Sequence, residues 1–167
     1  GGSKVIGNDG SIYITWYTRL DPSNTDYISS NSDFFLSKFN TDGVKEWTQS
    51  LGSYLVNSFN ITDIEKDNKS SIYISGTVRG DLDDQTNSGE TDVFLSKFNT
   101  DGVKEWTKLL GSSQNDGNAI LKIGNEDSIY IAGRTLGNLE NQINSGQPFT
   151  RDIFLTKTIQ DFNQINE

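Results

Sequence analysis

The sequence predicts an all-β chain of tandem antiparallel units, arranged like the blades of a β-propeller. The stretch FLSKFNTDGVKEWT occurs twice without one difference, from Phe35 to Thr48 and from Phe94 to Thr107. No segment keeps a 3.6-residue apolar period over the ~12 residues that a helix normally needs. The tetrad SIYI recurs at intervals close to 60 residues, and its copies start at Ser11, Ser71 and Ser128. Four-stranded units in tandem are typical of propeller blades.

A second series of heptads shows how many units the chain contains. DFFLSKF, DVFLSKF and DIFLTKT start at Asp33, Asp92 and Asp152. The 167 residues therefore hold three copies of one unit, and we expect a single repeat domain over 1–167. The expected blades cover about 3–53, 54–112 and 113–167. A β-sandwich is the competing architecture, but it would not require three copies of one hairpin.

The middle copy shows the expected strands most clearly. Four runs are rich in β-branched and aromatic residues, and clusters of Asn, Asp, Gly and Ser separate them. These runs are Phe59–Asp67, Ser71–Thr77, Asp92–Phe98 and Val103–Gly111. We expect them to form a four-stranded antiparallel blade.

The repeated fourteen-residue stretch is predicted to be a β-hairpin. Its NTDG tetrad ends at Gly43 in one copy and at Gly102 in the other. Asn and Asp suit the early turn positions, and Gly supplies the positive φ that closes a short turn. Trp47 and Trp106 then occupy equivalent places on the returning strand, where we expect them to pack against a neighbouring unit.

The first and third copies depart from the pattern. Trp16 stands in the first copy where the other two have Gly76 and Gly133. The third copy ends in TKTIQDFNQINE, which has neither the Asp-Gly turn nor the Trp, so we expect its outer strand to be missing. Because a propeller ring normally needs ~4–8 blades, we expect a partial ring, or one half of a ring formed by two copies.

The second and third copies resemble the bacterial repeat family that is named for seven-bladed β-propellers. The matching positions are Asp92, Phe94, Lys97, Gly102, Trp106, Leu110-Gly111, Asn118-Ala119-Ile120 and Ile129–Thr135. The resemblance extends over nearly the whole chain, although Trp16 and the C-terminal stretch depart from it. It implies a repeat scaffold of a secreted or cell-surface bacterial protein, without a general catalytic motif.

Composition excludes several kinds of chemistry. The chain has no His and no Cys, which removes the Ser-His-Asp triad, disulfides and Cys-ligated zinc. A formal net charge of −9 argues against nucleic acids and anionic membrane surfaces as partners. No apolar run approaches ~20 residues, so we expect no membrane insertion. Gly1-Gly2-Ser3 looks like a tag scar or the edge of an excised fragment.

Two candidate binding sites stand out. Asp81, Asp83 and Asp84 lie close together in a Gly-flanked loop, where carboxylates could bind Ca²⁺, although the spacing is not that of an EF-hand. A solvated acidic loop is the interpretation we favour for them. Trp16 breaks the repeat, which makes it a candidate ligand-binding residue. No other cofactor is indicated.

The repeated charged residues have two interpretations. Asp33, Asp92 and Asp152 could form a ring of carboxylates, but a structural bond to a nearby backbone amide explains their presence in every copy better. We expect the repeated lysines to pair with carboxylates of an adjacent blade, and these are Lys38, Lys97 and Lys157.

The sequence favours a non-catalytic scaffold or interaction module, extracellular or at the cell surface. Its expected partners are proteins: a second copy of the chain, or neighbouring blades of a longer chain. The alternative is a lectin-like propeller that binds glycans. This function requires the same binding residues at the same loop position in each copy, whereas the sequences of the loops between the second and third strands are interpreted as divergent. A fragment of a propeller enzyme, similar to quinone-dependent dehydrogenases, is the third hypothesis.

Overall fold

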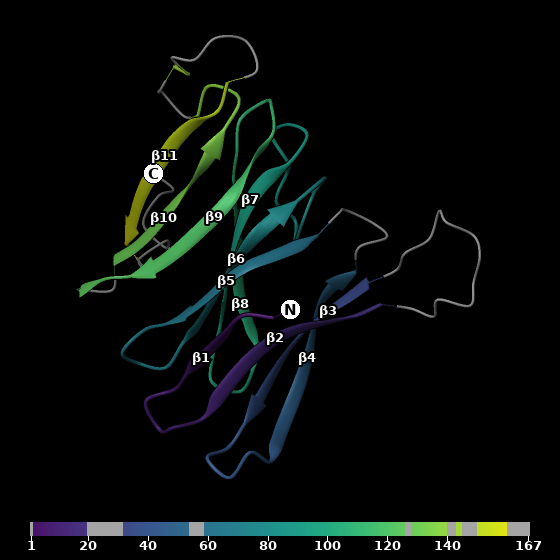
Figure 1. The fold of residues 1–167 in the computed structure, drawn as a ribbon, viewed down its shortest axis with the longest axis vertical. Helices are drawn as coiled ribbons and strands as arrows, with labels where there is room; N and C mark the ends of the chain where they lie inside the picture. Colours follow the sequence, from purple (N-terminus) through teal and green to yellow (C-terminus); the bar gives the residue numbers. More distant parts are fainter. Residues whose placement is uncertain are drawn as a thin grey trace.

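The computed structural model describes residues 2–19, 32–53, 59–125, 128–139, 143–144 and 150–159. Within these ranges the chain forms eleven strands and no α-helix. The strands make three antiparallel sheets, each a simple meander in chain order (Figure 1). None of the described sheets closes on itself. The prediction of an all-β chain with three antiparallel units is confirmed.

The three sheets follow the three sequence copies. Sheet 1 contains β1 (Lys4–Ile6), β2 (Ile12–Arg19), β3 (Ser32–Phe39) and β4 (Lys45–Ser53). Sheet 2 contains β5 (Asn60–Lys66), β6 (Ile72–Val78), β7 (Asp92–Phe98) and β8 (Lys104–Leu110). Sheet 3 contains β9 (Asp116–Ile123), β10 (Ser128–Thr135) and β11 (Asp152–Ile159). The four strands predicted for the middle copy are confirmed, and the described part of the third copy has three strands, as expected.

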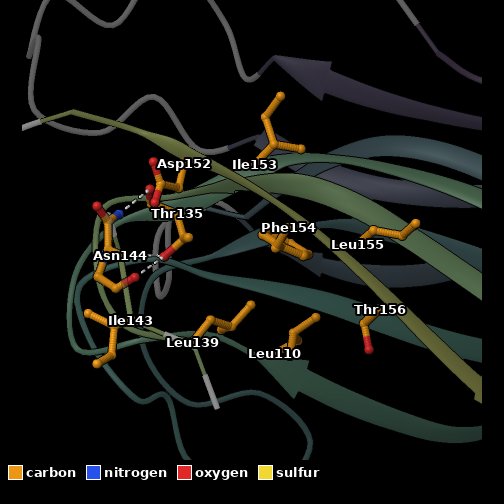
Figure 2. Close-up of a pocket in the computed structure, with 11 residues that line it drawn as sticks. Leu110, Thr135, Leu139, Ile143, Asn144, Asp152, Ile153, Phe154, Leu155 and Thr156 are labelled. Carbon is orange, nitrogen blue, oxygen red and sulfur yellow. Dashed lines mark hydrogen bonds between the residues drawn. The ribbon is translucent and has the colours of Figure 1, made fainter. Parts of the chain in front are cut away.

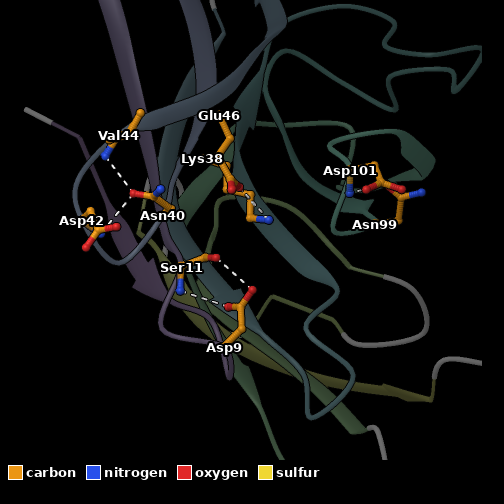
Figure 3. A network of polar contacts seen from close by, with 9 residues as sticks. All are labelled: Asp9, Ser11, Lys38, Asn40, Asp42, Val44, Glu46, Asn99 and Asp101. Atoms are coloured by element: carbon orange, nitrogen blue, oxygen red, sulfur yellow. Dashed lines mark hydrogen bonds and ion pairs between the residues drawn. The ribbon is translucent and has the colours of Figure 1, made fainter.

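The two identical hairpins have identical turns. The side-chain oxygens of Asn40 and Asn99 each accept hydrogen bonds from the backbone amides two and four residues later, at 3.0 and 2.9 Å. Figure 3 shows both bonds at Asn40 and the first bond at Asn99. Gly43 and Gly102 close the turns with φ of 77° and 79°. These are positive values that suit glycine, as the NTDG motif predicts.

Successive sheets stack face to face, and the first strand of each sheet lies against the first strand of the next. β1 contacts β5, and β5 contacts β9. One apolar cluster fills the space between sheets 1 and 2: Tyr13, Phe34, Leu36, Leu51, Phe59, Ile64, Ile72, Ile74, Val78, Phe94 and Phe98. A second fills the space between sheets 2 and 3: Tyr73, Val93, Leu95, Ala119, Leu121, Ile129, Ile131, Leu139 and Phe154.

Strand alternation gives each sheet two different apolar faces. In β7, Phe94 and Phe98 belong to the cluster shared with sheet 1, whereas Val93 and Leu95 belong to the cluster shared with sheet 3. Side chains of a strand point alternately to opposite faces, so both faces of sheet 2 are buried. We call the face toward the preceding sheet the leading face and the other the trailing face.

The repeated lysines bind within their own sheets. Lys38 and Lys97 each place Nζ 2.9 Å from a glutamate oxygen on the next strand, that of Glu46 or Glu105 (Figure 3 shows the first pair). Each glutamate lies at an irregularity in the strand pairing beside its lysine, where the register shifts between Lys38 and Phe39 or between Lys97 and Phe98. The predicted pairing with an adjacent unit is therefore wrong for these two lysines.

Trp47 and Trp106 have the packing role predicted for them. Each ring is half-buried and packs against the apolar cluster on the trailing side of its sheet. Trp47 contacts Tyr13 with ring centroids 6.0 Å apart, and Trp106 contacts Tyr73 at 6.1 Å. The identical hairpins therefore make equivalent contacts in consecutive sheets.

Candidate interaction surfaces

The trailing face of sheet 3 is apolar and uncovered in the described structure. Ile153 and Leu155 in β11 are 83% and 71% exposed. Their counterparts in sheet 2, Val93 and Leu95, are 0% and 3% exposed because sheet 3 covers them. Ile120, on β9 at the other side of β10, adds a further exposed side chain at 64%. This face thus presents the kind of surface that binds a following sheet elsewhere in the chain.

Trp16 lies on the leading face of sheet 1. It pairs across strands with Phe35, and the two rings are stacked with centroids 4.6 Å apart. Its Nε1–H donates a hydrogen bond of 2.8 Å to Ser37 Oγ. In sheets 2 and 3 this position is Gly76 or Gly133, where an added Cβ would lie 2.5 or 2.6 Å from the paired phenylalanine ring. Trp16 therefore occupies a place that the paired phenylalanine ring fills in the other two sheets.

A hollow adjoins Trp16. The ligand-binding role of Trp16 stays a prediction. The volume of the hollow is about 210 Å³, and Thr15, Tyr17, Phe34 and Asn60 are among the residues that line it. The walls combine apolar rings with short polar groups. The Trp16 side chain already contacts residues of its own sheet, through the stacked ring of Phe35 and the hydrogen bond from its Nε1–H.

Two hollows follow the outer edge of β11. The larger, of about 470 Å³, lies between Phe154 and Thr156 of β11 and the side chains of Leu110 and Leu139 (Figure 2). The smaller, of about 320 Å³, continues along Thr156 and the two residues after it. In sheets 1 and 2 this side of the third strand is occupied by β4 or β8. The edge of β11 is therefore a groove bordered by apolar side chains.

The acidic loop predicted as a calcium site is held by internal bonds. Asp83 and Asp84 have φ of 48° and 60° and form a two-residue turn that is closed by Leu82 and Gln85. Aspartate tolerates this left-handed conformation better than most residues. Asp81 Oδ1 accepts a 2.8 Å hydrogen bond from a backbone amide later in the loop.

The carboxylate of Asp83 already has a cationic partner. Its Oδ2 lies 2.6 Å from Lys104 Nζ and accepts a hydrogen bond of 2.5 Å from Thr107 Oγ1. Partial burial opposes ionisation, but these two bonds outweigh it and lower the pKa of Asp83. Among the described residues no group of three acidic side chains is placed to hold a metal ion. A calcium site at Asp81, Asp83 and Asp84 stays a prediction.

Two of the long loops share a pattern that sequence reasoning missed. Gly80–Gly89 and Gly137–Gly146 both read Gly-x-Leu-x-x-Gln-x-Asn-Ser-Gly. In both loops the third-position leucine packs against an intersheet cluster. The residue before this leucine accepts, through its side-chain oxygen, a 2.8 Å hydrogen bond from the backbone amide of the Asn that both loops share. The sequence signal for this shared loop is the Asn-Ser-Gly triplet, which follows the leucine at the same spacing in both copies. The bonds described above give the loop a structural role.

Asp92 has the structural role favoured for the repeated aspartates. It is 0% exposed, and its Oδ2 accepts a 2.7 Å hydrogen bond from the backbone amide of Ser88. Asp116, also buried, accepts a bond of 2.7 Å from the amide of Ser112. Burial and the charge of Asp116 raise the pKa of Asp92, although the bond from Ser88 opposes this. The side chain of Asp33 lies outside the described residues, and Asp152 lines the larger hollow.

Comparison with known proteins gives one informative similarity. No protein-family model matches the chain. The chain is 25% identical over 173 aligned positions to the regulatory protein FlaEY of Caulobacter vibrioides, and the match covers 96% of this chain. It covers 18% of that protein, so the chain spans less than a fifth of the relative that it matches. No described helix is long and apolar enough to cross a membrane.

Proposed function

We propose that this chain is a non-catalytic repeat module of the β-propeller type, which acts as a scaffold by binding β-sheets of its own kind at its open faces. The observation that carries this proposal is the exposure of Ile153 and Leu155, whose counterparts are buried in sheet 2. An apolar face of this kind, rimmed by polar residues, is typical of an interaction site.

The arrangement of the sheets supports the propeller interpretation. Each sheet is a meander, consecutive sheets stack on their faces, and their first strands are neighbours, as the inner strands of propeller blades are. The partner sheet belongs either to a second copy, which would complete a six-bladed ring, or to a longer chain. The similarity to a much longer protein that is named as regulatory is compatible with an interaction role.

The test is the mass in solution, measured by light scattering over a series of protein concentrations. We expect the wild-type chain to self-associate toward twice its monomer mass. Ile153→Lys combined with Leu155→Lys should shift this association to higher concentration at least ~10-fold, because two lysines on the face would have to be desolvated. The matched control is Val44→Lys with Val103→Lys, at turn positions 60% and 56% exposed. It should behave like the wild type.

A monomer at every concentration would overturn association of these faces between copies. Specific binding on a glycan array, or a turnover in the purified chain that survives in the lysine variant, would favour the lectin or enzyme hypothesis instead. Circular dichroism of each variant checks that the substitutions leave the sheets intact.

A further inference from the structure

The leading face of sheet 1 is a second exposed apolar surface. Ile6 of β1 is 61% exposed, and Trp16 of β2 is 36% exposed. Both lie on one face, because Ile6 pairs with Ile12, and Ile12 and Trp16 are four residues apart on the same strand. Half-buried side chains extend this surface between them: Ile12, Ile14, Phe35 and Phe39.

The equivalent surface of sheet 2 is covered by another sheet. The residues at the same positions of the repeat are Ile72, Ile74, Phe94 and Phe98. They are between 0% and 2% exposed, because they belong to the cluster between sheets 1 and 2. The trailing face of sheet 1 supplies Phe34 and Leu36 to the same cluster. A leading face with this pattern therefore binds a trailing face within the chain.

The junction of sheets 1 and 2 shows which aromatic residues meet. Phe59 stacks on Phe94 with ring centroids 4.5 Å apart, and Phe34 of the trailing face contacts the Phe59 ring at 5.3 Å. Phe35 is the counterpart of Phe94, and Trp16 stacks on it at 4.6 Å. The leading face of sheet 1 thus carries a stacked pair like the one that Phe34 meets on sheet 2.

Ile153 occupies in sheet 3 the position that Phe34 occupies in sheet 1. Both are the second residue of the Asp-led heptad, as is Val93 in sheet 2. Phe34 and Val93 are buried in the two intersheet clusters, whereas Ile153 is 83% exposed. A trailing face that packs as sheet 1 packs on sheet 2 would therefore place Ile153 against a stacked pair of rings.

We propose that the leading face of sheet 1 binds the trailing face of sheet 3 of a second copy, with Ile153 of that copy against the rings of Trp16 and Phe35. The contact is heterologous, since it joins two different faces. Both described junctions between sheets combine a trailing face with a leading face, which favours this contact over one between two like faces. The inference rests on the proposed function and deepens it, because it identifies the second face and its partner.

Two variants separate the two faces. Ile6→Lys with Trp16→Lys disables the leading face, and Ile153→Lys with Leu155→Lys disables the trailing face. By light scattering, each variant alone should be a monomer at a concentration where the wild type dimerises. An equimolar mixture should recover twice the monomer mass, because it contains one intact face of each kind. The mixture should need an at least ~10-fold higher concentration than the wild type, since one contact forms instead of two.

The contact between Ile153 and Trp16 is tested in the same mixture. The leading-face variant carries fluorescein on its α-amino group, and anisotropy follows its titration with the trailing-face variant. Ile153→Ala in the first chain and Trp16→Ala in the second should each weaken binding at least ~3-fold. Together they should weaken it by less than the product of the two effects, because the side chains meet. Tyr17→Ala in the second chain is the control, since Tyr17 contacts Phe34 on the other face of sheet 1.

The outcomes distinguish this inference from the proposed function. If the leading-face variant alone associates as strongly as the wild type, like faces bind each other, which overturns the inference and leaves self-association intact. A mixture that stays monomeric while the wild type dimerises overturns it too, as do effects of the two alanines that multiply. A wild type that is monomeric at every concentration overturns both. Circular dichroism checks each variant, and Ile6→Lys alone replaces the leading-face variant if Trp16→Lys loses the sheets.

Discussion

The ring of Trp16 lies on the ring of Phe35 with centroids 4.6 Å apart and planes inclined by 24°. Phe59 lies on Phe94 in nearly the same geometry, at 4.5 Å and 20°. In sheet 2 the outer ring of this stack, Phe59, comes from the segment that precedes β5, and glycine at position 76 leaves room for the ring of Phe94. In sheet 1 the outer ring is that of Trp16, which stands at the position that corresponds to Gly76. The first unit therefore stacks a side chain of its own strand β2 on its half-buried phenylalanine.

This relationship predicts an energetic coupling between Trp16 and Phe35. In a double-mutant cycle with Trp16→Ala and Phe35→Ala, measured by urea unfolding, the coupling energy should be about 0.5–1.5 kcal/mol, as for other stacked aromatic pairs. Tyr17 with Phe35 is the control pair, since Tyr17 points to the other face and contacts Phe34. A coupling near zero for Trp16 would mean that its ring does not depend on Phe35.

Gly76 should not accept any side chain. A Cβ there would lie 2.5 Å from Phe94 Cε1 and 2.0 Å from the carbonyl oxygen of Asn60. Because the second contact is with backbone, a rotamer change cannot relieve it. We expect Gly76→Ala to lower the free energy of unfolding by at least about 1–3 kcal/mol, the usual cost of overpacking.

The matched control for this substitution is Gly117→Ala. Its added Cβ would make an ordinary contact of 3.5 Å with Thr77 Cγ2. Its unfolding midpoint in urea should stay closer to the wild type than that of Gly76→Ala. Equal midpoints for the two variants would show that the tight packing at Gly76 is absent in solution.

Trp106→Ala should destabilise the chain through the loss of contacts with Tyr73 and the cluster between sheets 2 and 3. Complete burial of a Trp predicts a cost of about 3–5 kcal/mol. The half-buried ring here should give about 2–3 kcal/mol, since part of its surface stays in water in the folded state. Urea unfolding measures the change. Val103→Ala, at an exposed turn position, should cost less than about 0.5 kcal/mol.

The repeat made the fold readable from the sequence. Three copies of SIYI and of the Asp-led heptad located the sheets, because β-branched and aromatic runs bounded by Asn and Gly define strands locally. The NTDG turns were predictable for the same reason. The partners of Lys38 and Lys97 were not, because strand register places Glu46 and Glu105 beside them, and register depends on pairing that single strands do not reveal.

The candidate surfaces were only partly predictable. The substitution of glycine by Trp16 was visible, but its stacking on Phe35 required the pairing of β2 with β3. The exposure of Ile153 could not be read from its heptad, because the same pattern is buried in sheet 2. A repeat shows what its faces can bind, whereas its neighbours determine which face is left open.

Asp92 should give the stability a distinct pH dependence. Burial, joined by the charge of Asp116, raises its pKa in the folded state above the ordinary value of 3.8. The folded state then binds this proton more readily than the unfolded state. Its contribution is therefore destabilising above the raised pKa and disappears as the pH falls through that pKa toward 3.8.

Asp92→Asn keeps an acceptor for the Ser88 amide and removes the buried charge. We expect this substitution to increase the free energy of unfolding at pH 7 by about 1 kcal/mol. Urea unfolding between about pH 4 and 8 should also show that the free energy of unfolding of the variant no longer falls with rising pH to the extent that Asp92 causes in the wild type. Asp42→Asn, at an exposed turn position, is the control and should leave the wild-type curve unchanged. Parallel curves for the wild type and Asp92→Asn would show that this carboxylate ionises in the folded protein as easily as in the unfolded chain.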